Sequence, residues 1–336
     1  MESGHLNASS TMKLLQKLAK STLLTILIGC FLWALGALYY DWAGVIFAGA
    51  NAAAILAMLA FARNRYLKLA IFVTWFGIIL LTWTFLKPSN DREWQPDFAK
   101  TAWAKVDGDV VTLHNVRNFN YRTESDYTPS WETRTVRLSQ LTGIDVFMNY
   151  WGLSWMSHPI ISFQFADAPP VCFSIEARKV IGRDYSPVAG LYRQYELIYL
   201  IADERDVIRV RTNYREGQDS YLYRLNLPPD KARQRFLEYL TTLNVLHETP
   251  RWYNIISTNC TTSIRAQYPS WERAPWDWRI LINGKADEML YERGTLTTEG
   301  LPFAELKQRA LINVSAKAAD DDPDFSKKIR QGLPGM

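Results

Sequence analysis

Three long apolar runs dominate the first quarter of the chain. They span Leu23–Tyr40, Ala43–Ala62 and Leu69–Leu86, and each approaches the roughly 20 residues that a helix needs to cross a bilayer core. The first and third runs are rich in Leu, Ile, Phe and Trp, whereas the second is rich in Ala and contains Asn51. The pattern predicts three transmembrane helices joined by short turns.

From Asp91 to about Val314 the apolar positions follow the pattern of a globular α+β domain. Period-two alternation predicts strands first, at Val110–Val116, Thr133–Leu138, Ile144–Tyr150, Ile160–Phe165, Val171–Arg178, Tyr195–Ala202, Val207–Thr212 and Ser220–Leu225. Helical spacing then predicts helices over Lys231–Leu246 and over Cys260–Gln267, before Pro269. We therefore expect an antiparallel sheet with packed helices.

The pattern divides the chain into four parts. Residues 1–20 are expected to be a cytoplasmic N-terminus, 21–87 a three-helix membrane anchor, and 91–314 a folded domain on the far side of the membrane. The last stretch, 315–336, is polar, with Asp320–Asp322 and late Gly and Pro, and we expect a flexible tail there.

The charge distribution supports this topology and excludes a nucleic-acid partner. Of 38 basic and 34 acidic residues, seven basic and two acidic ones precede Pro88, so the remainder carries 31 and 32. The positive charge therefore belongs to the membrane segment and not to a DNA-binding surface. Basic clusters before the first run and between the second and third belong in the cytoplasm. Three crossings then place everything after Lys87 on the non-cytoplasmic side of the inner membrane, in a multi-pass protein.

Cys260 is the first candidate for chemistry. Asn259 can cap the helix that follows, which places Cys260 in the first turn, where the helix dipole and free N–H groups favour a thiolate. The same N–H groups could hold an oxyanion during acyl transfer. The alternative is a disulfide between Cys260 and Cys172, which an oxidising compartment would permit.

His158 is the second candidate, at the start of a predicted hairpin. A loop over 166–170 would pair Phe165 with Val171, Ser162 with Ser174 and His158 with Arg178. His158, Ser162, Ser174, Glu176 and Arg178 would then share one face, with Glu176 diagonal to His158. A carboxylate there could orient the imidazole and stabilise its protonated form. The alternative is a structural polar face with a histidine at its edge.

Other chemistry has little support in the sequence. The predicted outer domain has two Cys and three His, without zinc-like spacing, so we expect no metal or other cofactor. Trp271, Trp276 and Trp278 alternate with Arg273 and Arg279, a composition that suits lipid headgroups as well as it suits internal packing.

Four segments resemble the Lnb N-terminal periplasmic domain family over about Trp94–Gln267. They are His158-Pro-Ile-Ile-Ser-Phe, Ser174-Ile-Glu-Ala-Arg-Lys179, Tyr195-Glu-Leu197 and Tyr253-Asn254 with Asn259-Cys-Thr-Thr262. That family includes lipoprotein N-acyltransferases with a cysteine nucleophile. The order of His and Cys is also similar to permuted papain-like (NlpC-like) folds.

The resemblance implies a specific reaction. Cys260 would take an acyl chain from a membrane phospholipid as a thioester and pass it to the N-terminal amine of a diacylglyceryl-cysteine lipoprotein. His158 would act as general base and acid, and Glu176 would orient it. Asn259, Ser174, Arg178 and Tyr253 are the candidates for contacts with the substrate or oxyanion. Two other functions remain open: a periplasmic cysteine amidase or peptidase, and a membrane-tethered sensor or scaffold without catalytic activity.

Overall fold

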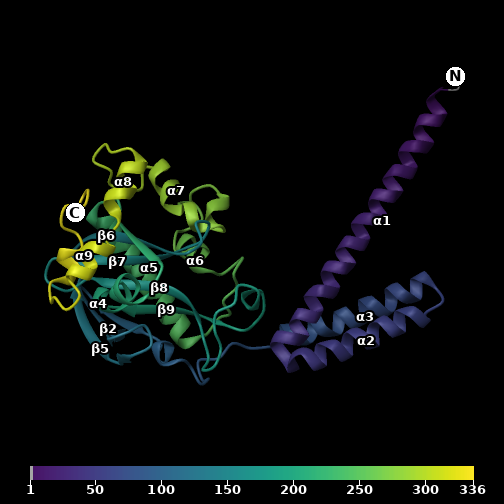
Figure 1. Cartoon of the computed structure of the whole chain (residues 1–336), viewed down its shortest axis with the longest axis horizontal. Coiled ribbons are helices and arrows are strands. Elements are labelled where there is room, and N and C mark those ends of the chain that lie inside the picture. The colour runs from purple at the N-terminus through teal and green to yellow at the C-terminus, as the bar shows by residue number, and fades with distance from the viewer. Residues whose placement is uncertain (1–2) are drawn as a thin grey trace. The chain divides into compact units, whose positions relative to one another are not determined.

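The computed structural model describes residues 3–336, which form two compact units (Figure 1). One unit holds the chain up to Lys87 together with Tyr192–Gln194, and the other holds Pro88–Leu191 and Tyr195–Met336.

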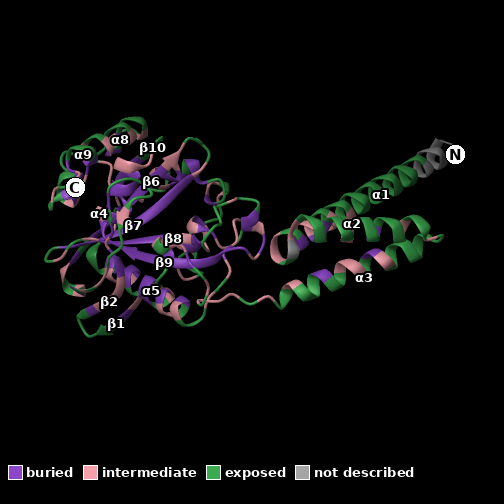
Figure 2. Ribbon diagram, turned by 60° about the horizontal axis from the view of Figure 1, so that its bottom comes forward, coloured by how far each residue is buried: buried purple, intermediate pink, exposed green. Residues whose placement is uncertain are grey.

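The first unit contains three long apolar helices, as the hydropathy pattern predicts. They are α1 (Ser3–Ala37), continued by a π-helical turn over Leu38–Ala43, α2 (Gly44–Phe61) and α3 (Arg65–Thr84). The segments Ser10–Trp42, Gly44–Phe61 and Arg65–Thr84 are long and apolar enough to cross a membrane. Their surface is mostly exposed (Figure 2), so a bilayer would cover their apolar side chains. Asn51 in α2 donates to the carbonyl of Phe47 at 3.0 Å, which satisfies its amide within the helix.

The second unit is an α+β domain built on an eight-stranded sheet. The strands run in the order β1-β2-β9-β8-β7-β6-β10, and β5 pairs with the other side of β2. Their bounds are β1 Trp103–Asp107, β2 Val110–Arg117, β5 Trp131–Arg137, β6 Leu141–Trp151, β7 Ser157–Phe165, β8 Val171–Arg178, β9 Glu196–Ala202 and β10 Gln218–Arg224, with a separate ribbon of β3 (Asn120–Tyr121) and β4 (Tyr127–Thr128). Neighbours are antiparallel except β2 and β9, which meet in parallel at Arg117 and Ala202. The predicted α+β class is confirmed, although the sheet is mixed and not purely antiparallel.

Short helices and one long helix cover the sheet. They are α4 (Glu204–Val207), α5 (Pro229–Glu248), α6 (Cys260–Ala266), α7 (Ala286–Glu292), α8 (Phe303–Ala310), α9 (Asn313–Ala318) and α10 (Phe325–Lys328). The two predicted helices correspond to α5 and α6. The predicted strand Val207–Thr212 is wrong, because this segment ends α4 and enters a π-helical turn over Val210–Tyr214. Asp203 starts this helical segment by accepting a hydrogen bond from the N–H of Arg205.

The two faces of the sheet are covered by different elements. On one face, Phe147, Ile160 and Cys172 pack with residues of α4, α9 and α10. On the other face, aromatic side chains of β7 and β8 contact α5, with Phe163 and Phe236 ring centroids 4.9 Å apart. The strands β8 and β9 are buried over most of their length (Figure 2). Both faces of the sheet are therefore packed against other elements. This close packing holds the strands, and the side chains at their ends, in defined positions.

The end of the chain differs from the flexible tail expected over 315–336. Ala316, Phe325 and Ile329 belong to the same buried cluster as the first face of the sheet. Arg330 forms ion pairs with Asp145 of β6 at 2.9 Å and with Glu204 of α4 at 2.5 Å, and both carboxylates are fully buried. Arg330 and the apolar side chains therefore anchor this segment in the fold, while charged residues such as Asp321 and Lys327 remain exposed.

Replacing Arg330 with alanine is expected to lower the free energy of unfolding by roughly 3–5 kcal/mol, because it leaves Glu204 buried with an uncompensated charge. Denaturant unfolding of the full chain, followed by tryptophan fluorescence, measures this change. Lys327→Ala is the matched control, since Lys327 pairs only at the exposed surface with Asp324. Equal stability of both variants would contradict a structural role for this end of the chain.

Candidate active site

Cys260 is the first residue of α6, as the capping pattern predicts. The Asn259 side chain accepts a hydrogen bond from the N–H of Thr262 at 2.8 Å, and Thr262 Oγ1 accepts from the N–H of Asn259 at 2.9 Å. This capping box fixes the start of the helix. The N–H groups of Cys260 and Thr261 belong to the first turn of the helix, where no backbone carbonyl of the helix accepts their hydrogen bonds. Both therefore point out of the N-terminal end of α6. They are suited to hold an oxyanion beside the sulfur.

His158 lies near the start of β7, in a hairpin whose predicted register is wrong by two residues. The structure pairs Ile160 with Ser174 and Ser162 with Cys172, whereas the sequence analysis paired Ser162 with Ser174. A shift of two residues keeps every side chain on its predicted face. It moves Glu176 from a diagonal position to one opposite His158, which brings the two side chains closer.

The imidazole of His158 is held by a polar network on that face. Its Nε2 lies 2.8 Å from Ser174 Oγ and 3.0 Å from Glu176 Oε1, and Ser174 Oγ donates to the same carboxylate at 2.6 Å. Arg211, from the π-helical turn, contacts Glu176 Oε1 at 3.0 Å. Because Nε2 is taken up by Ser174 and Glu176, Nδ1 is the nitrogen left for the Cys260 thiol.

The electrostatics of this network favour an ionised histidine. Burial opposes the charged ring, but the Glu176 carboxylate and hydrogen bonding with Cys260 and Glu176 outweigh it and raise the pKa of His158 to about 9. Burial also opposes the Glu176 carboxylate, yet His158, Arg211 and Ser174 together hold the pKa of Glu176 well below its usual range. An imidazolium at this place stabilises a neighbouring thiolate.

Asn283 is a further site residue, and the sequence analysis missed it. Its Nδ2 donates to Thr261 Oγ1 at 2.8 Å and lies 3.8 Å from Cys260 Sγ, while its Oδ1 accepts from the N–H of Ser157 at 2.8 Å. Asn283 thereby ties the start of α6 to the residue before His158. The next residue must be small, because a Cβ on Gly284 would lie 2.2 Å from the carbonyl oxygen of Ser154.

A cavity of about 320 Å³ opens onto the cysteine and the histidine. Its lining includes His158, Glu176, Arg211, Asn259, Cys260 and Asn283, together with aromatic side chains such as Trp151, Trp155 and Tyr253. Apolar and aromatic walls with converging polar groups are typical of ligand sites, and charged residues such as Arg117, Lys179 and Arg215 also line this cavity. The Tyr253 hydroxyl lies 3.3 Å from that of Tyr185, which also lines the cavity.

Other candidate residues lie elsewhere. Arg178 is buried, where it donates to the carbonyls of Phe98 and Ala99 and to Asn90, so the structure does not bring it to Cys260. His114 stacks on Trp103, and the His247 ring bonds to Thr101.

The cysteines do not form the alternative disulfide. Cys30, Cys172 and Cys260 are all free, and Cys172 is buried in the core on β8. Within residues 3–336, no group of His, Cys, Asp and Glu side chains is arranged to hold a metal ion.

One known protein family matches the part of the chain that contains this site. Residues 127–284 match the family model described as the Lnb N-terminal periplasmic domain, a stretch that contains His158, Glu176, Cys260 and Asn283. It begins later and ends later than the sequence resemblance. No match was found among curated proteins or among solved structures.

Proposed function

We propose that the chain, whose residues 127–284 match the family model of the Lnb N-terminal periplasmic domain, is a lipoprotein N-acyltransferase that works through a thioester at Cys260. The donor would be a membrane phospholipid, and the acceptor the N-terminal amine of a diacylglyceryl-cysteine lipoprotein. The observation that carries this proposal is the placement of Cys260 at a capped helix start beside a histidine that Glu176 holds. The order of His before Cys along the chain supports a permuted papain-like arrangement.

In the first half-reaction the Cys260 thiolate attacks an ester carbonyl of the phospholipid. The resulting oxyanion is held by the N–H groups of Cys260 and Thr261. As the C–O bond breaks, the His158 imidazolium gives its proton to the leaving oxygen, and a lysophospholipid departs. The acyl chain stays on the sulfur as a thioester.

The second half-reaction uses the same histidine as a base. Acylation removes the hydrogen bond with Cys260 that helps to raise the pKa of His158, so the pKa of His158 falls once the thioester has formed. The neutral ring accepts a proton from the attacking amine as the new C–N bond forms. The C–S bond breaks and Cys260 leaves as a thiolate beside the imidazolium, which restores the starting state.

A membrane anchor fits this reaction because both substrates reside in a bilayer. The family is periplasmic, and three helices able to cross a membrane precede the matched residues. We propose that all three helices span the inner membrane, with Lys13, Lys17 and Lys20 in the cytoplasm, which puts the active-site domain on the periplasmic side.

Intact-protein mass spectrometry of the purified chain mixed with phospholipid tests the proposal. A mass increase of one acyl chain that hydroxylamine removes is expected in the wild type and in Cys172→Ala, and it should be absent in Cys260→Ala. Addition of a diacylglyceryl-cysteine peptide should then discharge the thioester and yield the N-acylated peptide.

Other outcomes would point to different functions. An adduct that water discharges as fast with the peptide as without it would mean a lipid hydrolase. An unmodified protein that cleaves peptides in the absence of lipid would mean an amidase or peptidase. Because the two cysteines of the domain are both free, a disulfide-based scaffold has no support from the structure.

A further inference from the structure

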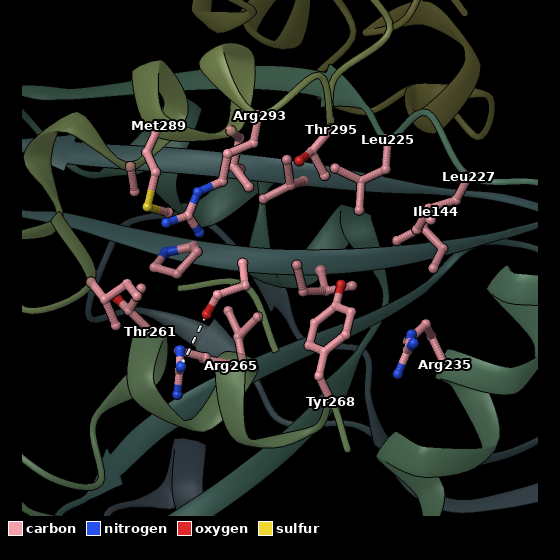
Figure 3. A pocket seen from close by; sticks show the side chains of 18 of the residues that line it. Ile144, Leu225, Leu227, Arg235, Thr261, Arg265, Tyr268, Met289, Arg293 and Thr295 are labelled. Atoms are coloured by element: carbon pink, nitrogen blue, oxygen red, sulfur yellow. Dashed lines mark hydrogen bonds between the residues drawn. The ribbon is translucent and has the colours of Figure 1, made fainter. Parts of the chain in front are cut away.

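A second cavity lies on the face of the sheet opposite to the His158 network. It has a volume of about 290 Å³ and is bounded by strands β6 and β7 and by helices α5, α6 and α7 (Figure 3). Strand β7 lies between the two cavities, and its side chains point alternately to the two faces of the sheet. Pro159, Ile161 and Phe163 line this second cavity, whereas His158 lines the catalytic cavity. Most of its remaining walls are aliphatic, including Val146, Met148, Ile264, Ile280 and Leu290.

The cavity runs from the start of the cysteine helix to the far end of the sheet. Thr261 and Met289 lie at one end, and Ile144, Leu225 and Leu227 at the other (Figure 3). Thr261 directly follows Cys260, and its hydroxyl accepts from Asn283, which lines the catalytic cavity. The Thr261–Asn283 pair is therefore where the two cavities approach each other.

Basic and aromatic side chains surround this second cavity. Arg265 and Arg273 form no ion pair within residues 3–336; they donate to the carbonyls of Ala274, Tyr268 and Ala266. The Nε of Arg265 is buried and has no hydrogen-bond partner among these residues. The adjoining loop exposes Trp271 by 83%, Trp276 by 57% and Trp278 by 56%, so these rings are not core. Trp and Arg together suit the headgroup layer of a membrane.

We propose that this cavity holds one acyl chain of an anionic phospholipid, with the lipid phosphate against Arg265 and Arg273. The identification of this lipid as the acyl donor rests on the proposed function. The carbonyl end of the chain lies at Thr261, within reach of the Cys260 sulfur, and the methyl end lies toward Leu225 and Leu227. Arg265 and Arg273 supply the donors that a phosphate oxygen accepts.

Physical chemistry favours a hydrocarbon as the occupant. An aliphatic cavity even of about 150 Å³ stays dry and takes up apolar molecules. Aliphatic side chains form the larger part of the lining here, which also includes the charged side chains of Arg235, Glu272 and Arg293. A chain of methylenes gains about 0.8 kcal/mol for each one buried. A polar peptide would lose its hydrogen bonds with water in the same space, so this cavity does not suit an amidase substrate.

Photo-crosslinking of the full chain in lipid nanodiscs tests the site without turnover. The protein carries Cys260→Ala, and the probes are phosphatidylglycerols with a diazirine either at the methyl end or near the carbonyl of one acyl chain. We expect the methyl-end probe to label peptides that contain Ile144 or Leu225–Leu227, and the carbonyl-end probe to label those with Thr261 or Met289. Labelling confined to residues 10–84, or to Trp151 and Trp155 of the catalytic cavity, would overturn the proposal.

The headgroup contact is tested by charge. Arg265→Gln combined with Arg273→Gln should reduce labelling by phosphatidylglycerol at least several-fold, and should leave labelling by a neutral diacylglycerol probe unchanged. Arg122→Gln is the matched control, because Arg122 pairs with Asp126 on an exposed loop. Equal losses with both probes would overturn the phosphate contact. If the labelling is as expected but the wild type forms no thioester, the lipid site stands and the proposed transferase function is rejected. If the wild type forms the thioester but the labelling is absent, the transferase function stands and the lipid site is rejected.

Discussion

A His158→Gln variant is expected to form the thioester at Cys260 roughly 10²–10⁴ times more slowly than the wild type, which is the usual range for loss of a general acid–base. Glutamine can still form a hydrogen bond with Ser174, but it can neither hold the proton that stabilises a thiolate nor give one to the leaving oxygen. The measurement is the initial rate of acyl-enzyme formation by quenched mass spectrometry at pH 7, with phospholipid in excess.

His114→Gln is the matched control for this experiment. His114 stacks on Trp103 at the other end of the sheet order, with ring centroids 3.8 Å apart, so its loss should leave the rate unchanged. A wild-type rate in His158→Gln would show that another group activates Cys260. The catalytic role of His158 would then have to be abandoned, although a thioester at Cys260 would still be possible.

Glu176→Gln is expected to slow thioester formation at pH 7 by at least roughly 10²-fold, toward the 10⁴-fold loss seen when a catalytic triad loses its carboxylate. The carboxylate is the main influence that raises the pKa of His158, and burial opposes it. Without this charge, burial and the nearby Arg211 should bring the pKa of His158 below its ordinary value of 6.5. The ion pair with Cys260 would then be absent at neutral pH.

The pH dependence of Cys260 alkylation by iodoacetamide measures this change. A Cys30→Ser background leaves Cys260 as the accessible thiol, because Cys172 is fully buried. In the wild type the rate should be high at pH 7 and change little up to about pH 9, where His158 loses its proton. In Glu176→Gln the rate should be low at pH 7 and rise with pH as for an unassisted thiol. Identical profiles would exclude the ion pair.

The free energy of unfolding should also depend on the titration of His158. Because the pKa of His158 is raised from 6.5 to about 9 on folding, its contribution is complete below pH 6.5 and is lost as the pH rises through about 9. At about 1.4 kcal/mol for each pKa unit, this amounts to roughly 3 kcal/mol. The stability difference between wild type and Glu176→Gln should therefore be smaller at pH 10 than at pH 7. Ser174→Ala, which keeps the carboxylate, should retain most of the wild-type pH profile.

Much of this site could be predicted from local sequence. Asn259 followed by Cys-Thr-Thr has the pattern of a helix start, and the structure forms the capping box there. The alternation of β7 and β8 correctly placed His158, Ser174 and Glu176 on one face, because face depends only on whether a position is odd or even. The wrong register did not matter for this reason.

The remaining parts depend on tertiary packing. Arg211 lies in a segment whose β-branched residues imitate a strand, and it reaches Glu176 only because that segment coils into a π-helical turn. Asn283 is far along the chain from His158 and has no local pattern to mark it. Arg178 occupies the polar face of its strand, yet the carbonyls that hold it belong to residues 98 and 99, before the sheet begins. The roles of Arg211, Asn283 and Arg178 therefore depend on which residues the fold brings close to them, and residue type alone does not indicate these neighbours.

The position of Arg330 has a consequence for how the protein is made. Its carboxylate partners Asp145 and Glu204 precede it by 185 and 126 residues. During synthesis both acids emerge long before Arg330, so this cluster of ion pairs is complete only once Arg330 has been made. A chain that stops before Arg330 would keep Asp145 paired with Arg224 but leave the buried carboxylate of Glu204 without its arginine, a product suited to removal by proteases.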